Sequence, residues 1–183
     1  MAESFPYTPP EVWEDTQFAI HRSFPSQYGG SEDDPLFEIV AVDTHSFVLI
    51  MPPVGSDAPE GVFDMYVGVN ATEGDSDIRG KGLGELLVRI GIAQAQADGY
   101  STLRTPVSAE GLGLLIKVFG KDELRIRQPA TDEGGLPVSV EDLEQRLRPS
   151  EENQFEYCIE ADIASLDTDG WNLPTPQEHE LVI

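Results

Sequence analysis

The chain has 183 residues, of which 39% are hydrophobic, and its 34 acidic and 11 basic residues give a formal net charge of −23 at pH 7. This length predicts a single compact domain, 1–183, that buries a sizeable core. The negative charge argues against direct nucleic-acid binding, because a polyanion gains nothing from releasing the counterions of phosphates. No apolar run is long enough to cross a bilayer, so we expect no membrane partner.

The cysteine and histidine content argues against disulfides and metal sites. One cysteine, Cys158, excludes an internal disulfide and a cysteine-rich zinc site. His21, His45 and His179 are far apart and lack ligand spacing, so no metal is expected. The first ten residues show neither a signal peptide nor a presequence. We therefore expect a cytoplasmic protein or, alternatively, a component of a virion assembled in a reducing compartment.

The first 35 residues are rich in proline, glycine and aromatic side chains, which predicts an irregular N-terminal arm. At most one short helix is expected there, around residues 10–20. Strands are predicted next at 36–42 and 46–51, where β-branched and aromatic residues dominate and a turn-like Asp43-Thr44-His45 separates the two runs.

A third strand is predicted over 62–69. Alternation places Phe63, Met65, Val67 and Val69 on one face, and Asp64 on the other. The segment 70–78 that follows is acidic and contains glycine, so it is expected to be a solvated loop.

A glycine-rich turn, Arg79-Gly80-Lys81-Gly82-Leu83-Gly84, then leads directly into an amphipathic helix that Gly99 ends. Glycine lets a backbone turn tightly, and the first N–H groups of a helix have no partner within it. Such a turn favours a bound anion, most often phosphate. The spacing fits neither the Rossmann pattern nor the P-loop.

The run from Arg79 to Gly84 resembles the R-x-x-G-x-G signature of the GCN5-related N-acetyltransferase (GNAT) family. The resemblance implies an α/β (α+β) fold, in which a mixed, mostly antiparallel twisted sheet carries two central helices. In this chain we expect the core at 36–165, with an irregular N-terminal arm before it and a C-terminal tail at 166–183. It also implies that acetyl-CoA is bound by the end of the third strand and by the turn. The implied cofactor-binding residues are Gly68, Val69, Arg79, Gly80, Lys81, Gly82, Leu83 and Gly84.

The rest of the chain predicts further elements. A strand is expected at 100–107, followed by a helix that begins after Ser108 and ends at Phe119-Gly120. A further helix is expected to start at Ser139, and a last strand is expected at 155–163. The second helix departs from the family, because Ile116 or Lys117 stands where the resemblance implies a tyrosine that protonates the departing thiolate.

Two functions remain open. In the first, the chain transfers an acetyl group from acetyl-CoA to an amine by direct attack, with Asp64 or Glu73 as candidate base. In the second, it is a non-catalytic GNAT-like scaffold, such as a structural subunit of a phage virion or an acidic decoy. The terminal arms could then mediate a homo-oligomer or a larger protein assembly. The acidic excess also has a simpler explanation in solubility or a salty habitat.

Overall fold

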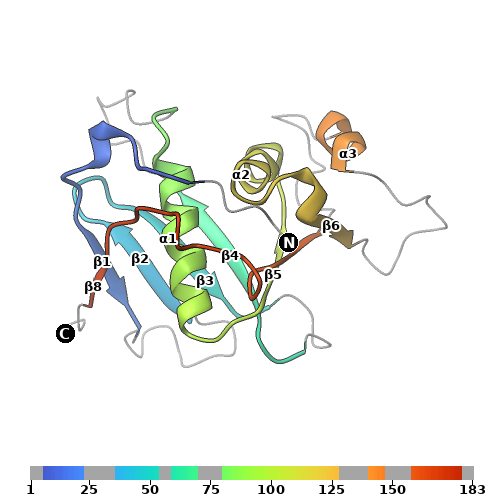
Figure 1. Ribbon diagram of the computed structural model, residues 1–183, viewed down its shortest axis with the longest axis horizontal. Helices are drawn as coiled ribbons and strands as arrows, with labels where there is room; N and C mark the ends of the chain where they lie inside the picture. The colour runs from blue at the N-terminus through green and yellow to red at the C-terminus, as the bar shows by residue number, and fades with distance from the viewer. Residues whose placement is uncertain are drawn as a thin grey trace.

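The computed structural model describes residues 6–22, 36–53, 59–69, 80–127, 140–146 and 158–178. Figure 1 shows a curved sheet with α1 packed across it. The strands are β1 (Phe18–His21), β2 (Phe37–Ala41), β3 (Ser46–Met51), β4 (Val62–Gly68), β5 (Thr102–Pro106), β6 (Leu124–Arg127), β7 (Cys158–Asp162) and β8 (Gln177–Glu178). The helices are α1 (Leu83–Ala97), α2 (Ala109–Phe119) and α3 (Val140–Arg146), with short 3₁₀ turns η1 (Glu11–Trp13) and η3 (Lys121–Glu123).

The strands form one sheet in the order β6-β7-β5-β4-β3-β2-β1-β8. Neighbouring strands run antiparallel, except that β4 is parallel to β5 and β1 is parallel to β8. The helix α1 connects β4 to β5, as a parallel connection requires. The predicted fold class, a mixed and mostly antiparallel sheet with two central helices, is confirmed.

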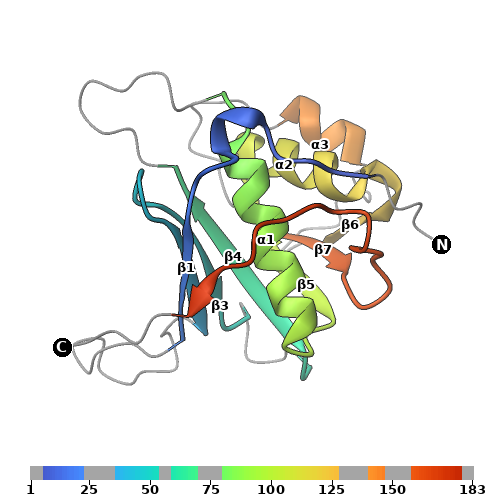
Figure 2. The same cartoon turned by 60° about the vertical axis from the view of Figure 1, so that its left-hand side comes forward.

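The central strands follow the alternation seen in the sequence. Ile39, Val48 and Ile50 are fully buried beneath α1, while the residues between them are half-buried. On α1 itself, Gly91 lets the helix approach the sheet closely, because a Cβ there would lie 3.3 Å from the Val48 methyl carbons. Figure 2 shows α1 lying along this side of the sheet.

The predicted ends of the two central helices are confirmed. At the end of α1, Gly99 has φ +95° and the Tyr100 N–H donates to the Ala95 carbonyl oxygen at 3.0 Å, which closes the helix. At the start of α2, the Ser108 hydroxyl oxygen accepts from the Gly111 N–H at 3.1 Å. Ser139, the predicted cap of α3, lies outside the described residues, as do residues 155–157 of the last predicted strand.

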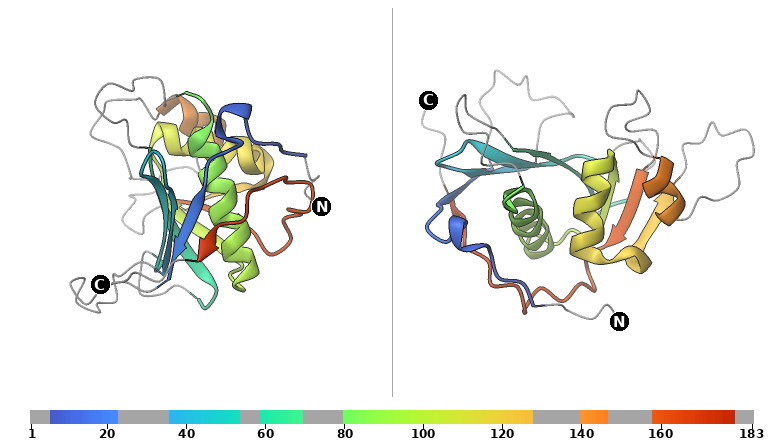
Figure 3. Two further views of the ribbon diagram at one scale, coloured as in Figure 1. Left: turned by 90° about the vertical axis from the view of Figure 1, so that its left-hand side faces the viewer. Right: turned by 90° about the horizontal axis from the view of Figure 1, so that it is seen from above.

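The termini differ from the expectation. The short helix expected around residues 10–20 is wrong beyond η1, because Phe18 and Ile20 are buried in a strand, β1, that extends the sheet. The tail after Asp167 packs against the molecule instead of extending: Trp171 is buried and bridges to Tyr7. Figure 3 shows the two terminal segments side by side on the side of α1 away from the sheet. We call residues 6–13 and 163–173 the terminal clasp.

None of the helices within the described ranges is both long and apolar enough to span a bilayer.

Candidate functional site

The glycine turn has the geometry of an anion site. Gly82 precedes α1 with φ +84°, and the Leu86 N–H is the first to donate back into the helix, to the Gly82 carbonyl oxygen at 3.1 Å. Within the described part of the chain, the N–H groups of Leu83, Gly84 and Glu85 therefore have no acceptor. Lys81 is exposed beside them. Three free donors and one cation at a helix start favour a phosphate group.

The turn has no room for a side chain at Gly82. A Cβ there would lie 3.0 Å from the Cγ of Pro10, and the positive φ disfavours any other residue. The sequence alone could not show this contact, since Pro10 lies in the terminal clasp.

The second part of the site is the gap between β4 and β5. In the described residues, the backbone pairing of these strands joins Val62 to Thr102 and Phe63 to Leu103 and ends there. Beyond this point the Thr105 Oγ1 lies 3.2 Å from the Met65 carbonyl oxygen, so the Met65 backbone faces β5. Because alternate residues of a strand direct their N–H and C=O groups to the same edge, we infer that the Val67 backbone faces the gap too.

The end of β4 lies close to the glycine turn. Val69, which follows β4, lies against the start of α1: a Cβ on Gly84 would be 3.7 Å from its Cγ2 and 3.5 Å from Cδ1 of Leu114 on α2. The residue that follows β4 therefore lies beside the start of α1, where the N–H groups have no acceptor within the described residues.

Gly68 has a packing role as well as a predicted binding role. It pairs with Phe47 of β3, and a Cβ there would lie 2.6 Å from the Phe47 ring. By the alternation above, its backbone faces β3, and the neighbouring Val67 faces the gap.

Asp64 lies where β4 and β5 part. Burial raises the pKa of its carboxyl above the usual range, and hydrogen bonding from the Thr105 hydroxyl and the Met65 N–H opposes that rise. The Met65 N–H donates to Asp64 Oδ1 at 2.6 Å. A half-buried carboxyl with a raised pKa is a candidate proton acceptor.

Two of the other predicted site residues lie outside the described part of the chain. Arg79 and Glu73 lie outside the described residues. At the position of the missing tyrosine, Ile116 is half-buried and Lys117 is exposed. In the described ranges no group of histidine, cysteine and carboxylate side chains could hold a metal ion.

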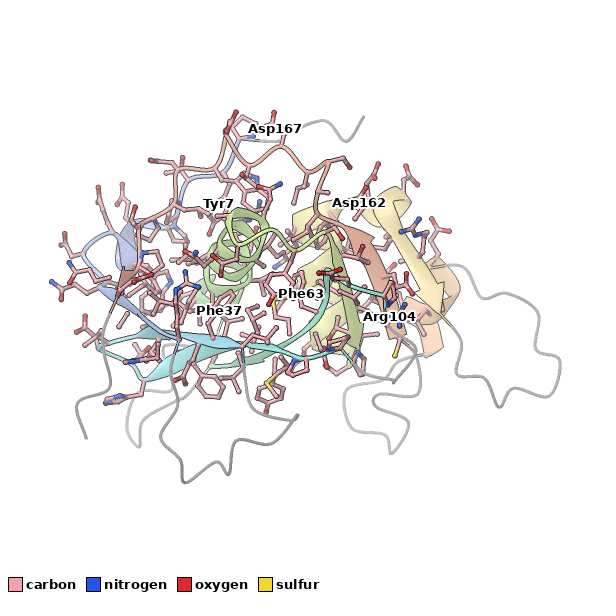
Figure 4. The ribbon with its side chains drawn as sticks, turned by 90° about the horizontal axis from the view of Figure 1, so that it is seen from below. Tyr7, Phe37, Phe63, Arg104, Asp162 and Asp167 are labelled. Atoms are coloured by element: carbon pink, nitrogen blue, oxygen red, sulfur yellow. The ribbon has the colours of Figure 1, made fainter. Side chains whose placement is uncertain are left out.

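Sequence reasoning missed the polar residues that β5 contributes. Thr105 sits in a run that predicted only a strand; a parallel pairing of this strand with the previous one would have placed it opposite Met65. Its neighbour Arg104, labelled in Figure 4, is buried and forms an ion pair with Glu160 of β7 (Nε–Oε1 3.2 Å). That charge is therefore compensated within the sheet.

The terminal clasp is held by a buried arginine. Arg89 on α1 lies between the rings of Tyr7 and Trp171, with its Cζ 4.1 and 4.6 Å from the two ring centroids, and pairs with Glu85 at 2.9 Å. Figure 4 shows Tyr7 on the side of α1 away from the sheet. Burial, followed by the charge of Glu85, raises the pKa of Tyr7 to about 12. The clasp is therefore a packed part of the molecule.

An unpaired strand end beside a glycine turn at a helix start favours an extended ligand with a phosphate group. No protein-family model matches the sequence, and no curated protein matches it either. Among solved structures, the chain is similar to a GNAT family N-acetyltransferase from Escherichia coli in complex with CoA, at 14% identity and TM-score 0.46, over 95% of this chain and 92% of that chain.

Two further structures are similar. One is an acetyltransferase from Bacillus subtilis in complex with CoA, at 13% identity and TM-score 0.46, over 84% of this chain and 99% of that chain. The other is the ribosomal-protein-S18-alanine N-acetyltransferase from Escherichia coli, at 15% identity and TM-score 0.41, over 82% of this chain and 84% of that chain.

Proposed function

We propose that this protein is an N-acyltransferase that uses acetyl-CoA to acetylate an amine by direct attack. One observation supports it most: within the described residues, the end of β4 that does not pair with β5 lies beside the N–H groups at the start of α1 that have no acceptor. In this proposal the first turn of α1 and Lys81 hold the diphosphate. The edge of β4 at Val67 and Val69 pairs with the amide-bearing arm, as an added strand pairs with a sheet edge. Bound acetyl-CoA supplies an activated acyl group as a thioester.

Asp64 is the proposed base. Its carboxyl lies at the point of divergence and accepts the proton that the attacking amine must lose. The raised pKa brings the carboxyl closer to neutral pH, where a general base works best. Glu73 stays a second candidate outside the described residues. Since α2 carries no tyrosine at the expected position, water is the proposed proton donor to the departing thiolate.

Binding of acetyl-CoA tests the proposal directly. A ligand at a hundred times its dissociation constant stabilises the folded protein by about 2.7 kcal/mol, which thermal unfolding detects. We expect such a shift for the natural chain. Gly82→Val should abolish it, because the side chain meets Pro10 and distorts the turn.

Gly99→Val is the matched control for this variant. Gly99 also has a positive φ, at the other end of α1, and nothing lies within 4 Å of a Cβ there. Both variants should lose about 1–2 kcal/mol from the left-handed backbone, and Gly82→Val should lose more because of its contact with Pro10. Only Gly82→Val should lose acetyl-CoA. Equal binding by the two variants would contradict the assignment of the turn.

Absence of any shift for the natural chain would favour the other function, a non-catalytic scaffold within a larger assembly. We also propose that residues 1–183 form one domain and that the protein, if it is an enzyme, acts in the cytoplasm. The acceptor is proposed to be the amine of a small molecule or of a protein N-terminus.

A further inference from the structure

One tryptophan of the terminal clasp touches the glycine turn. The indole N–H of Trp13 donates to the Lys81 carbonyl oxygen at 2.8 Å, across 68 residues of sequence. The Trp13 side chain is buried, with 7% of its surface exposed. A buried hydrogen bond of this length fixes its acceptor firmly.

The Lys81 carbonyl shares a peptide plane with the Gly82 N–H. In a trans peptide the C=O and N–H groups point in opposite directions, so an indole that fixes the carbonyl also fixes the N–H. The structure holds no cis peptide bond in its described part. The Gly82 N–H therefore points away from Trp13, and no acceptor meets it within the described residues.

From this geometry we infer that Trp13 is a positioning residue for the diphosphate of CoA: it aims the Gly82 N–H at the ligand. The inference rests on the proposed function and adds to it a residue outside the turn. A hydrogen bond to the carbonyl also polarises the peptide, which makes its N–H a better donor.

Trp13 is itself held in place by the body of the molecule. Its own N–H donates to the Pro10 carbonyl oxygen at 2.9 Å, which closes η1. Further along, the Tyr7 N–H donates to the Gly170 carbonyl oxygen at 3.0 Å, and the Tyr7 carbonyl oxygen accepts from the Asn172 N–H at 2.8 Å. These hydrogen bonds hold the segment that carries the Trp13 indole in place.

Trp13→Phe tests the inference, since it keeps a buried aromatic ring and removes the N–H donor together with part of the indole. We expect the dissociation constant for CoA, measured by titration calorimetry, to rise about tenfold, which corresponds to roughly 1.4 kcal/mol. Trp171→Phe is the matched control, because it removes the indole N–H of the other clasp tryptophan and keeps an aromatic ring against Arg89. It should bind CoA as the natural chain does.

The control variant also provides a spectroscopic measurement. The chain has two tryptophans, so Trp171→Phe leaves Trp13 as the only indole. Saturation with CoA should shift the indole N–H resonance of Trp13 and slow its exchange with water. This measurement remains decisive even where Trp13→Phe does not fold.

The outcomes separate the two proposals. If the natural chain binds no CoA, both are overturned. If it binds CoA and folded Trp13→Phe binds it equally well, or if the Trp13 indole resonance does not respond, only the role of Trp13 is overturned and the proposed function stands.

Discussion

Asp64 is an acidic residue in an environment that disfavours its charge. Burial raises the pKa of its carboxyl, and the two hydrogen bonds from Thr105 and Met65 only partly compensate. A carboxyl whose folded-state pKa is raised stabilises the fold fully below its unfolded pKa, and that contribution is lost as the pH rises through the folded-state pKa.

Asp64→Asn should therefore change the pH dependence of stability. The asparagine side chain does not ionise, so the variant avoids the cost of burying a charged carboxylate. Its free energy of unfolding should therefore increase relative to that of the natural chain as the pH rises above about 3.9, the pKa of an unperturbed aspartate. Denaturant unfolding at a series of pH values measures this. A constant difference between the two proteins across the series would contradict the burial of this charge.

The same variant tests the proposed chemistry. Loss of a general base should lower kcat for acetyl transfer by about 100-fold or more while the affinity for CoA is kept. Glu160→Gln is a suitable comparison, because it removes a carboxylate that lies on β7 and pairs with Arg104. Equal activity of Asp64→Asn and the natural chain would exclude Asp64 as the base.

At the scale of single residues, the sequence predicted what local geometry controls and missed what tertiary contacts control. Gly82 predicts a turn and Ser108 predicts a helix cap, because these residue types favour those local structures. Trp13 and Thr105 act through partners that lie 68 and 40 residues away, so nothing near them in sequence marks their roles. Arg89 is the clearest case: rings from both terminal segments enclose it, and nothing near it in sequence marks this role.

Among the elements, long periodic segments were predictable and short ones were not. The strands β2, β3 and β4 and the helices α1 and α2 all have clear alternation or helical spacing. By contrast, β1, β6 and β8 have between two and four residues, too few to show a period. They exist because neighbouring strands supply their hydrogen-bond partners.

Substitution by alanine should affect stability differently at two helical glycines. In α2, a Cβ on Gly113 meets nothing within 4 Å, whereas in α1 a Cβ on Gly91 meets the Val48 methyl carbons at 3.3 Å. Gly113→Ala should therefore stabilise the protein by about 0.5–1 kcal/mol, the usual gain from replacing glycine within a helix. Gly91→Ala should gain nothing, because the contact with β3 offsets the helix preference. Chemical denaturation of both variants checks this, and an equal gain would contradict the close packing of α1 on the sheet.

The whole molecule carries a charge of −23, and its own repulsion works against the compact state. Salt shortens the range of that repulsion, from about 30 Å at 0.01 M to about 8 Å at 0.15 M. We expect Tm to rise with added NaCl, by about 2–4 °C for each kcal/mol of repulsion removed. Choline chloride should act equally if screening is the cause, and a Tm that falls or stays constant would show that the charges are already compensated locally.

The terminal clasp has a consequence for biosynthesis. Tyr7 leaves the ribosome well before Trp171, yet the two bridge each other and enclose Arg89. A nascent chain can assemble most of its sheet and α1 during translation, but Tyr7 must wait for its partner until the segment around Trp171 emerges. The support beneath Trp13 is thus completed only after Trp171 has been made, and a chain stalled shortly before Trp171 would carry the glycine turn without its anchored neighbour.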